Sequence, residues 1–382
     1  MVQPVVYLHI GTRKSGTSYL QKTLRESVPE LRAQGVDLAF KTRKGQVVRQ
    51  LRPLQELAAG GDGAKAEASV VAMAEKFAGR PDATHLITLE DLAELPQVAA
   101  DLMLGALADV ELHLVVTARH WGYTIPSEWQ QCVKERDTVT YTDFVAAIRD
   151  RRPEAGLFLS RQDLPALVRR WRGALPADRV HVIAVPPSTR TEGTLVDLFC
   201  DLVGIDPSGL KLPKGTINQS IQLDQAETLR RVNIALGERL PDLDTDYRFG
   251  VREWLTRASL MSRASSSIRL PAEFADWCAQ EARAQYDGLL ALGVDLVGDA
   301  ADLLPAPGFA STVDSITDAQ VAAVAVDALA DLADLQWQQL VEHQAAMEDL
   351  TAERDELLGR LREAESTPRP TGVARWLGRG KS

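Results

Sequence analysis

The chain has 382 residues, of which 45% are apolar and 25% are charged, an ordinary composition for a globular protein. This length allows two or three domains, or one large α/β domain with an extension. Because 53 acidic residues outnumber 43 basic ones, the net charge is −10, which argues against nucleic acid or a heparin-like polyanion as the main partner.

The sequence shows no pattern of membrane insertion or export. No apolar run approaches the about 20 residues that a membrane-spanning helix needs. Residues 1–4 carry neither the basic segment nor the apolar core of a secretory signal. Three cysteines, Cys132, Cys200 and Cys278, are too far apart for a disulfide framework or a CxxC metal site. We therefore expect a soluble protein of the reducing cytoplasm, without a transmembrane segment.

Apolar, β-branched runs alternate with helical patterns through the first half of the chain. The candidate strands are residues 5–10, 36–40, 85–89, 112–118 and 180–185. Helical periodicity falls at residues 20–31, 101–108 and 164–175. Alternation of this kind predicts an α/β fold with a central parallel sheet. Ligands bind such sheets at the carboxyl ends of the strands, here after Ile10, Leu89 and Ala118.

The remainder of the chain is predicted to be mostly helical. Residues 223–303 are followed by a loop rich in Pro and Gly at 305–315. A heptad seam with three polar interruptions then runs through Leu329, Ala333, Gln336, Leu340, His343, Met347, Leu350, Arg354, Leu357 and Leu361. Two interpretations stay open: a short coiled coil that forms a homodimer, or an amphipathic helix lying back on the domain. Residues 366–382 are basic and predict a disordered tail or a weak contact with an anionic surface.

The loop after the first strand has the composition of an anion cradle. Gly11 and Gly16 have the spacing of the two glycines in a Walker loop, but Lys14 precedes the second glycine instead of following it. Backbone N–H groups and a helix N-terminus would still favour a phosphate here. The displaced lysine would meet the reactive end of a nucleotide from another direction.

Residues 8–21 closely resemble the 5′-phosphosulfate loop of bacterial sulfotransferases, which take the sulfuryl group from 3′-phosphoadenosine 5′-phosphosulfate (PAPS). This resemblance implies the P-loop-like sulfotransferase fold, a three-layer sandwich, and no need for a metal. The family usually has Pro at the position of Arg13, a departure that would loosen the loop or add a cation beside the sulfonate. The residues expected to bind the donor here are Arg13, Lys14, Ser15, Gly16, Thr17 and Ser18.

A second likeness concerns the donor's 3′-phosphate. The family binds it with an arginine that ends a strand and a serine eight residues later, which correspond to Arg119 and Ser127. A guanidinium and a hydroxyl near a helix start suit a phosphate dianion. Weaker likenesses extend the resemblance over about residues 4–300; they lie at residues 86–92, 171–182, 199–204 and 218–233.

The resemblance also implies roles in catalysis. Lys14 is assigned to the bridging oxygen and the leaving 5′-phosphate, where its ammonium would offset developing charge. The acceptor needs a general base, and Glu90 is the first candidate, with a first-turn helix acid as the alternative interpretation. His120 is the second candidate and His9 the third. The acceptor is expected to be a hydroxyl, less readily an amine, of a carbohydrate, glycolipid or small metabolite.

Two other functions remain as alternatives. A P-loop nucleotide kinase or NTPase is disfavoured by the displaced Lys14 and by the lack of a convincing strand-ended Asp for magnesium. A non-catalytic scaffold assembling through its C-terminal helix is disfavoured by Lys14, Arg119 and Ser127 together. The predicted division is a catalytic domain at residues 1–304, a linker and helix start at 305–326, the helix at 327–365 and the tail at 366–382. Positive charge is expected to concentrate at Arg13, Lys14 and Arg119.

Overall fold

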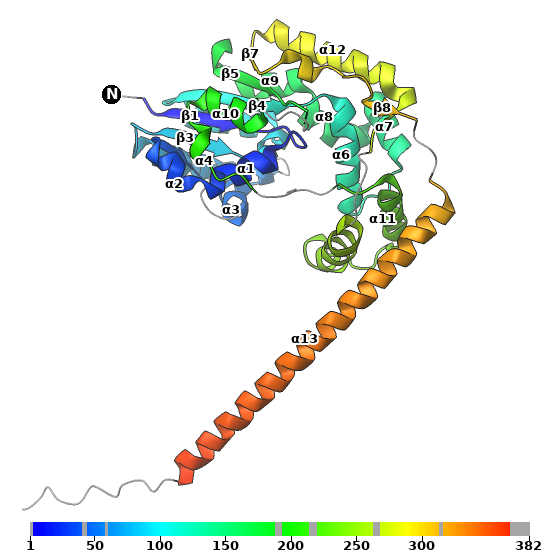
Figure 1. Cartoon of the computed structure of the whole chain (residues 1–382). Helices are drawn as coiled ribbons and strands as arrows, with labels where there is room; N and C mark the ends of the chain where they lie inside the picture. The colour runs from blue at the N-terminus through cyan, green and yellow to red at the C-terminus, as the bar shows by residue number, and fades with distance from the viewer. Residues whose placement is uncertain are drawn as a thin grey trace, which may run out of the picture.

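The computed structural model describes residues 3–39, 44–57, 60–187, 193–213, 220–262, 268–312 and 316–366. Its centre is a sheet of six parallel strands in the order β2-β3-β1-β4-β5-β7 (Figure 1). The strands are β1 (Val5–His9), β2 (Val36–Leu38), β3 (Thr84–Thr88), β4 (Glu111–Ala118), β5 (Val180–Ala184) and β7 (Asp295–Val297). The predicted α/β class with a parallel sheet is confirmed.

Five of these strands lie where the sequence predicts them, and β7 is the exception. The prediction for residues 223–303 was mostly helix, yet Asp295 to Val297 pair with β5 at the edge of the sheet. None of the three residues is buried. An edge strand this short and this exposed lacks the apolar run that marks a buried strand in a sequence.

The order of the strands places a switch point beside β1. From β1 the chain passes to the edge strand β2, whereas from β4 it passes to β5 on the other side. Because β1 and β4 are neighbours, with His9 opposite Val115, their carboxyl ends flank the point where the direction of winding changes. Open parallel sheets bind ligands at such a point. The loop after β1 and the residues after Ala118 meet here.

Helices cover both faces of the sheet, because successive side chains of each strand point to opposite faces. Leu8 and Leu114 belong to one buried cluster and Val115 to the other. The first cluster is closed by α3 (Lys44–Leu57), α4 (Gly63–Ala78), α5 (Gln97–Ala106), α9 (Leu164–Arg172) and the C-terminal part of α12 (Ala275–Leu292). The second is closed by α1 (Thr17–Glu26), α2 (Val28–Ala33) and α10 (Leu195–Val203).

A helical lobe stands beyond the carboxyl ends of the strands (Figure 1). It has its own apolar cluster, which includes Trp129, Tyr247 and Phe274. Its helices are α6 (Trp121–Lys134), α7 (Tyr141–Arg149), α8 (Gly156–Gln162), α11 (Leu223–Leu236) and the π-helix η5 (Leu243–Ser259), and β6 (Leu270–Pro271) pairs with β8 (Ala310–Ser311) beside them. Phe309 and Ala328 also pack into this cluster. The domain boundary at residue 304 stays a prediction.

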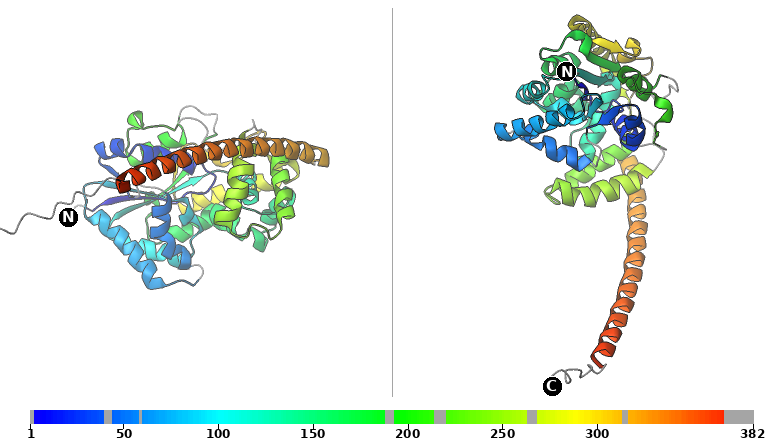
Figure 2. Two further views of the ribbon diagram at one scale, coloured as in Figure 1. Left: turned by 90° about the horizontal axis from the view of Figure 1, so that it is seen from below. Right: turned by 90° about the vertical axis from the view of Figure 1, so that its left-hand side faces the viewer.

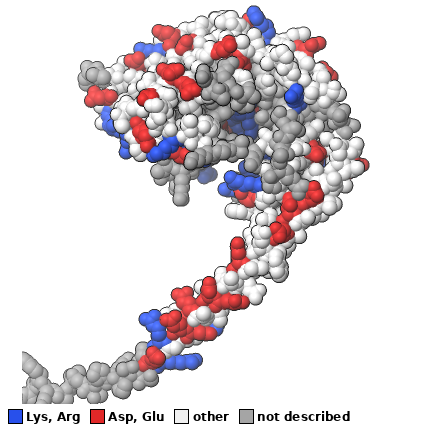
Figure 3. All heavy atoms as spheres, in the orientation of Figure 1, with Lys and Arg blue, Asp and Glu red and all other residues white. Residues whose placement is uncertain are grey.

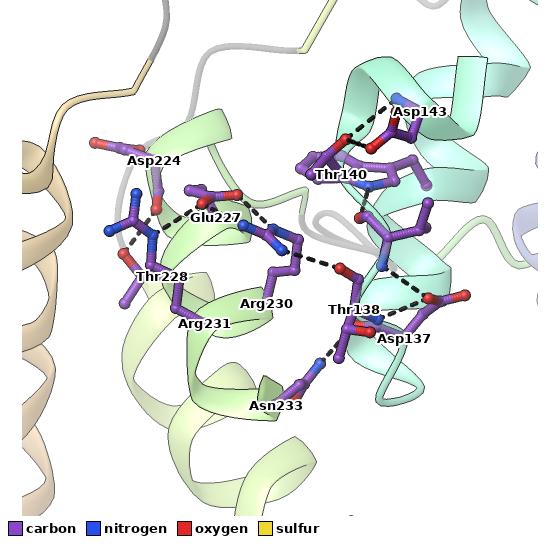
Figure 4. A network of polar contacts seen from close by, with 12 residues as sticks. Asp137, Thr138, Thr140, Asp143, Asp224, Glu227, Thr228, Arg230, Arg231 and Asn233 are labelled. Atoms are coloured by element: carbon purple, nitrogen blue, oxygen red, sulfur yellow. Dashed lines mark hydrogen bonds and ion pairs between the residues drawn. The ribbon is translucent and has the colours of Figure 1, made fainter. Parts of the chain in front are cut away.

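A polar network fastens α11 to the end of α6 (Figure 4). Asn233 donates to the carbonyl oxygens of Val133 and Asp137 at 2.8 and 3.0 Å. Arg230 donates to the carbonyl oxygen of Thr138 at 2.9 Å and is paired with Glu227 at 2.7 Å. These contacts fix the C-terminal end of α6, the helix that faces the loop after β1.

The C-terminal helix α13 (Asp318–Ser366) leaves the body as an arm (Figures 1 and 2). Its first turns lie on α11 and η5, where Ala328 is buried and Asp331 accepts a hydrogen bond from Ser259 at 2.7 Å. From Gln336 to Glu363 every side chain is exposed. The interpretation in which this helix lies back on the domain is therefore wrong for most of its length. No helix in the described ranges is both long and apolar enough to cross a membrane.

Candidate active site at the switch point

The loop between β1 and α1 folds back on itself through three residues with positive φ. These are Gly11 at 90°, Lys14 at 61° and Gly16 at 84°. A Cβ at Gly11 would come within 3.1 Å of the Glu90 backbone, and one at Gly16 within 3.0 Å of Leu195. Both glycines are therefore required by conformation and by space. Lys14 is the exception, a side-chain-bearing residue held in the left-handed region, which is a mark of functional loops.

The hydroxyl of Ser15 ties this loop to the sheet. It donates to the carbonyl oxygen of Thr12 at 2.5 Å and lies 2.7 Å from the hydroxyl of Thr117 in β4. The backbone N–H of Thr12 also bonds the carbonyl oxygen of Thr117 at 2.7 Å. Gly16 is the residue before α1, and among the described residues no side chain caps that helix. The loop thus presents an uncapped helix N-terminus, which favours an anion.

Lys14 reaches away from the sheet towards α6. Its Nζ donates to Oε1 of Gln131 at 2.9 Å. Burial lowers the pKa of Lys14, and so does the neighbouring Arg13, whereas the Glu128, Glu90 and Glu135 carboxylates oppose this effect. The ammonium group is therefore held in position by a helix from the other lobe.

Arg13 faces carboxylates on several sides. Its guanidinium lies 3.4 Å from Glu94 and 3.8 Å from Glu135. Burial acts to lower its pKa, but the carboxylates, including Glu128 and Glu90, outweigh burial and raise the pKa. The positive charges of Arg13 and Lys14 lie close together, as expected, but the surrounding carboxylates offset much of this charge.

Glu90 lies just after the carboxyl end of β3, as predicted, and contacts the start of α1, which follows the loop after β1. It begins the short 3₁₀ helix η1 (Glu90–Glu94), and its Oε2 accepts a hydrogen bond from the hydroxyl of Thr17. Thr17 is the first residue of α1 and is buried. Both interpretations made from the sequence, a base near the loop and a first-turn acid, fit this position.

The two histidines near the site are buried in different surroundings. His9 lies between the hydroxyls of Thr88 and Thr117, at 2.8 and 3.2 Å, and burial lowers its pKa to about 3. His120 caps α6 by accepting the N–H of Gly122 on Nδ1 at 3.1 Å. Burial, helped by Arg119, lowers its pKa to about 4. A neutral ring whose Nδ1 accepts carries its proton on Nε2, so that nitrogen is a donor.

Tyr123, Ser127 and Gln131 follow one another at intervals of four and so lie along one face of α6. Arg119 lies two residues before the first residue of this helix. The guanidinium of Arg119 lies 4.4 Å from the ring centre of Tyr123, and burial lowers its pKa. At the other end of this face, Gln131 holds Lys14. Of the two residues expected at the 3′-phosphate, Ser127 therefore shares a helix face with the residue that binds Lys14, and Arg119 contacts Tyr123 on that face.

The chain matches no family model, no curated protein and no solved structure. What the site can do is therefore argued from its residues. Ten buried side-chain polar atoms lack a hydrogen-bond partner in the described part of the chain, and four of them lie on the loop after β1, at the start of α6 or within α6: Thr12 Oγ1, His120 Nε2, Thr124 Oγ1 and Glu128 Oε1. Buried polar atoms are normally paired, so this group on one loop and one helix fits a polar ligand.

Sequence reasoning missed four side chains that shape the site. Glu128 and Gln131 come from α6. Each lies four residues after another polar residue, Thr124 or Ser127, and this spacing could have placed them on the same helix faces. Lys134 ends the same helix, and burial together with the charges of Lys14 and Arg252 lowers its pKa to about 8. Arg252 comes from η5, far away in sequence. Figure 3 shows Lys and Arg side chains in the hollow between the sheet and the helical lobe.

Proposed function

We propose that the protein is a PAPS-dependent sulfotransferase with the P-loop-like fold of that family. The observation that carries the proposal is the placement of Lys14. It stands at the switch point of a parallel sheet, beside an uncapped helix N-terminus, and is held by the helix face that bears Ser127. The resemblance of residues 8–21 to the 5′-phosphosulfate loop supplies the identity of the donor, and the three free thiols are consistent with a location in the cytoplasm.

In this proposal the backbone N–H groups from Ser15 to Ser18 and the hydroxyl of Ser18 bind the 5′-phosphate. PAPS supplies the sulfuryl group when it is bound. Lys14 stabilises the charge that develops on the bridging oxygen, and Arg119 with Ser127 holds the 3′-phosphate. Transfer through a loose, in-line transition state depends on such positioning more than on covalent chemistry. The residues assigned here need no metal ion.

Glu90 is the general base that we propose for the acceptor hydroxyl or amine. Its carboxylate lies beside the loop and has Thr17 as its present partner. His120 is a weaker candidate for the general base. Its Nδ1 accepts from Gly122, so its Nε2 carries the proton and cannot accept one from the acceptor. His9 is enclosed between two threonines. Glu128 would instead balance the charges of Lys14 and Arg13.

The acceptor we propose is a carbohydrate, glycolipid or small metabolite. The segments expected to contact it are residues 41–57 and 138–156. Residues 41–43 lie outside the described part of the chain. Residues 138–156 include α7, one of the helices of the lobe.

A thermal-shift comparison tests the donor. Stabilisation by 3′,5′-phosphoadenosine, by about 5 °C at a hundredfold excess over Kd, is expected, with no shift from ATP and magnesium. Arg119→Ala should lose the shift, whereas Lys22→Ala, an exposed lysine on α1, should keep it. Stabilisation by ATP and magnesium alone would instead favour a nucleotide kinase, and no shift with either ligand would favour a scaffold.

Sulfuryl transfer from PAPS, followed with a panel of hydroxyl acceptors, tests the catalytic assignments. Lys14→Ala is expected to reduce the rate by about 10²–10³. Glu90→Gln should lose transfer while it still binds 3′,5′-phosphoadenosine. A Lys14→Ala enzyme that transfers at the full rate would remove Lys14 from the mechanism.

A further inference from the structure

The exposed arm of α13 carries an apolar seam with three polar interruptions. In the structure this seam begins at Val326, one seam position before the Leu329 that the sequence pattern indicated, and it keeps the heptad spacing to Leu361. Its large apolar members are between 53% and 66% exposed; they are Val326, Leu329, Leu340, Met347, Leu350, Leu357 and Leu361. Helices of soluble proteins normally bury such a face, and an unsupported helix gains little stability from propensity alone.

The body lies on the side of α13 that the seam leaves free. With Val326 as heptad position a, the contacts that α13 makes with the body from Val324 onwards fall at positions c and f, whereas the ion pair of Asp318 with Arg231 lies before the seam begins. Val324 and Ala328 pack into the apolar cluster of the lobe, and Asp331 accepts from Ser259. Positions c and f are opposite the a and d positions of the seam. A second helix could therefore lie along the whole seam, in parallel, with each body on the outside of the pair.

We propose that α13 forms a parallel, two-stranded coiled coil with α13 of a second copy of this chain. The polar seam residues support an in-register pair of identical helices. Gln336, His343 and Arg354 would each meet their own counterpart, as polar core residues do when they specify register. Glu353, which precedes Arg354, would lie beside the partner's arginine and offset the charge.

Charges flanking the seam also fit this arrangement. In a parallel pair each g residue faces the e residue five positions later in the other helix. The facing pairs are Leu332 with Trp337, Gln339 with Gln344, Ala346 with Thr351, and Glu353 with Leu358. None of these pairs brings like charges together. Between Asp327 and Glu363 the acidic residues fall at positions b, c and f, except Glu353, and so lie outside the seam. Figure 3 shows acidic side chains along this arm.

The mass of the full chain in solution tests the proposal. Light scattering should give about twice 41.8 kDa. The double variant Leu340→Glu/Leu357→Glu places two acids in the seam and should give the monomer mass. The matched control Gln338→Glu/Ala352→Glu places the same charges at position f, away from the seam, and should remain dimeric. A wild-type monomer, a higher oligomer, or a seam variant that stays dimeric would overturn the proposal.

A cysteine cross-link tests the direction of the helices. Leu361→Cys lies at the far end of the seam, so two such residues meet only in a parallel pair. In an antiparallel pair whose seams overlap from Val326 to Leu361, they would be about 52 Å apart. Mild oxidation should therefore give a covalent dimer of Leu361→Cys and none of the wild type, whose Cys200 and Cys278 are buried and whose Cys132 is half-buried on α6 in the body. A dimer that this variant does not cross-link would overturn the parallel arrangement.

Discussion

Lys134 ends α6, one turn beyond the Gln131 that holds Lys14. Its pKa of about 8 results from burial and from the charges of Lys14 and Arg252. The charge of this lysine therefore changes at mildly alkaline pH. The protonated lysine attracts a polyanion bound beside Lys14, so the affinity of the protein for that polyanion should fall as pH rises through this pKa.

We expect the affinity for 3′,5′-phosphoadenosine to fall by about tenfold between pH 7 and pH 9.5 as Lys134 loses its proton. Calorimetric titration across this range measures it. Lys134→Arg, whose charge persists, should bind equally well over the whole range. If the arginine variant shows the same decline as the wild type, Lys134 is not the group that titrates.

Glu128 affects stability with the opposite pH dependence from a salt-bridged acid. Burial raises its pKa even though Lys14, Arg13 and Arg161 attract the ionised form. The folded carboxyl thus keeps its proton to a higher pH than the unfolded one. Its contribution to stability is complete below the unfolded pKa and is lost as pH rises through the folded pKa.

Replacing Glu128 by Gln should remove this loss. We expect the wild type to become less stable relative to Glu128→Gln as pH is raised from about 4.5 to neutrality. Urea unfolding at a series of pH values gives the difference. Glu75→Gln, on the exposed side of α4, is the control and should follow the wild type. A constant difference between wild type and Glu128→Gln would contradict the explanation.

Residues within one short segment were predictable, and residues brought together by packing were not. Gly11, Lys14 and Gly16 share one short loop, so their spacing in the sequence already places them together. Arg252, in contrast, reaches Lys134 only because η5 packs beside α6. The neutralising carboxylates around Arg13 were missed for the same reason, since Glu94 and Glu135 come from different elements.

Among the elements, α6 connects the sheet to the helical lobe and positions both ends of the site. Its start is packed closely: a Cβ at Gly122 would lie 2.4 Å from Phe309 and 2.7 Å from the His120 ring. Any side chain at this position must displace an aromatic ring or the helix start.

Gly122→Ala should therefore lower the free energy of unfolding by about 1–3 kcal/mol. Gly105→Ala in α5 is the matched control, because nothing lies within 4 Å of its Cβ. Helix propensity predicts that this control is stabilised by up to about 1 kcal/mol. Chemical denaturation of the two variants measures both values, and equal effects would show that the contact with Phe309 is not tight.

The long strands were predictable because they are buried on both faces, whereas helix ends and edge strands were not. The apolar spacing from Leu20 to Leu31 predicted one continuous helical face, yet α1 ends at Glu26 and α2 begins at Val28. Pro29, near the start of α2, has no N–H to continue the α1 ladder. Proline position, more than apolar spacing, decides this boundary.

For the whole molecule, the body and the arm are expected to unfold separately, since the exposed part of α13 makes no contact with the described body. The helical signal of the arm should melt at a temperature that rises with protein concentration, as expected for an associating helix. Circular dichroism at 222 nm at several concentrations measures this. The near-ultraviolet signal from buried Trp129 and Trp171 should keep its midpoint at every concentration. A single, concentration-independent transition would contradict separate unfolding.

The arm also determines how the protein moves in solution. From Ala333 to Ser366 it extends about 50 Å, whereas a body of about 300 residues has a radius of gyration near 19 Å. Friction on such a shape exceeds that of a sphere of equal mass. Even a monomer should therefore leave a sizing column early and sediment slowly, so apparent size from elution volume would imitate a dimer. Small-angle scattering should show a maximum dimension well beyond that of the body, and only a shape-independent mass distinguishes one chain from two.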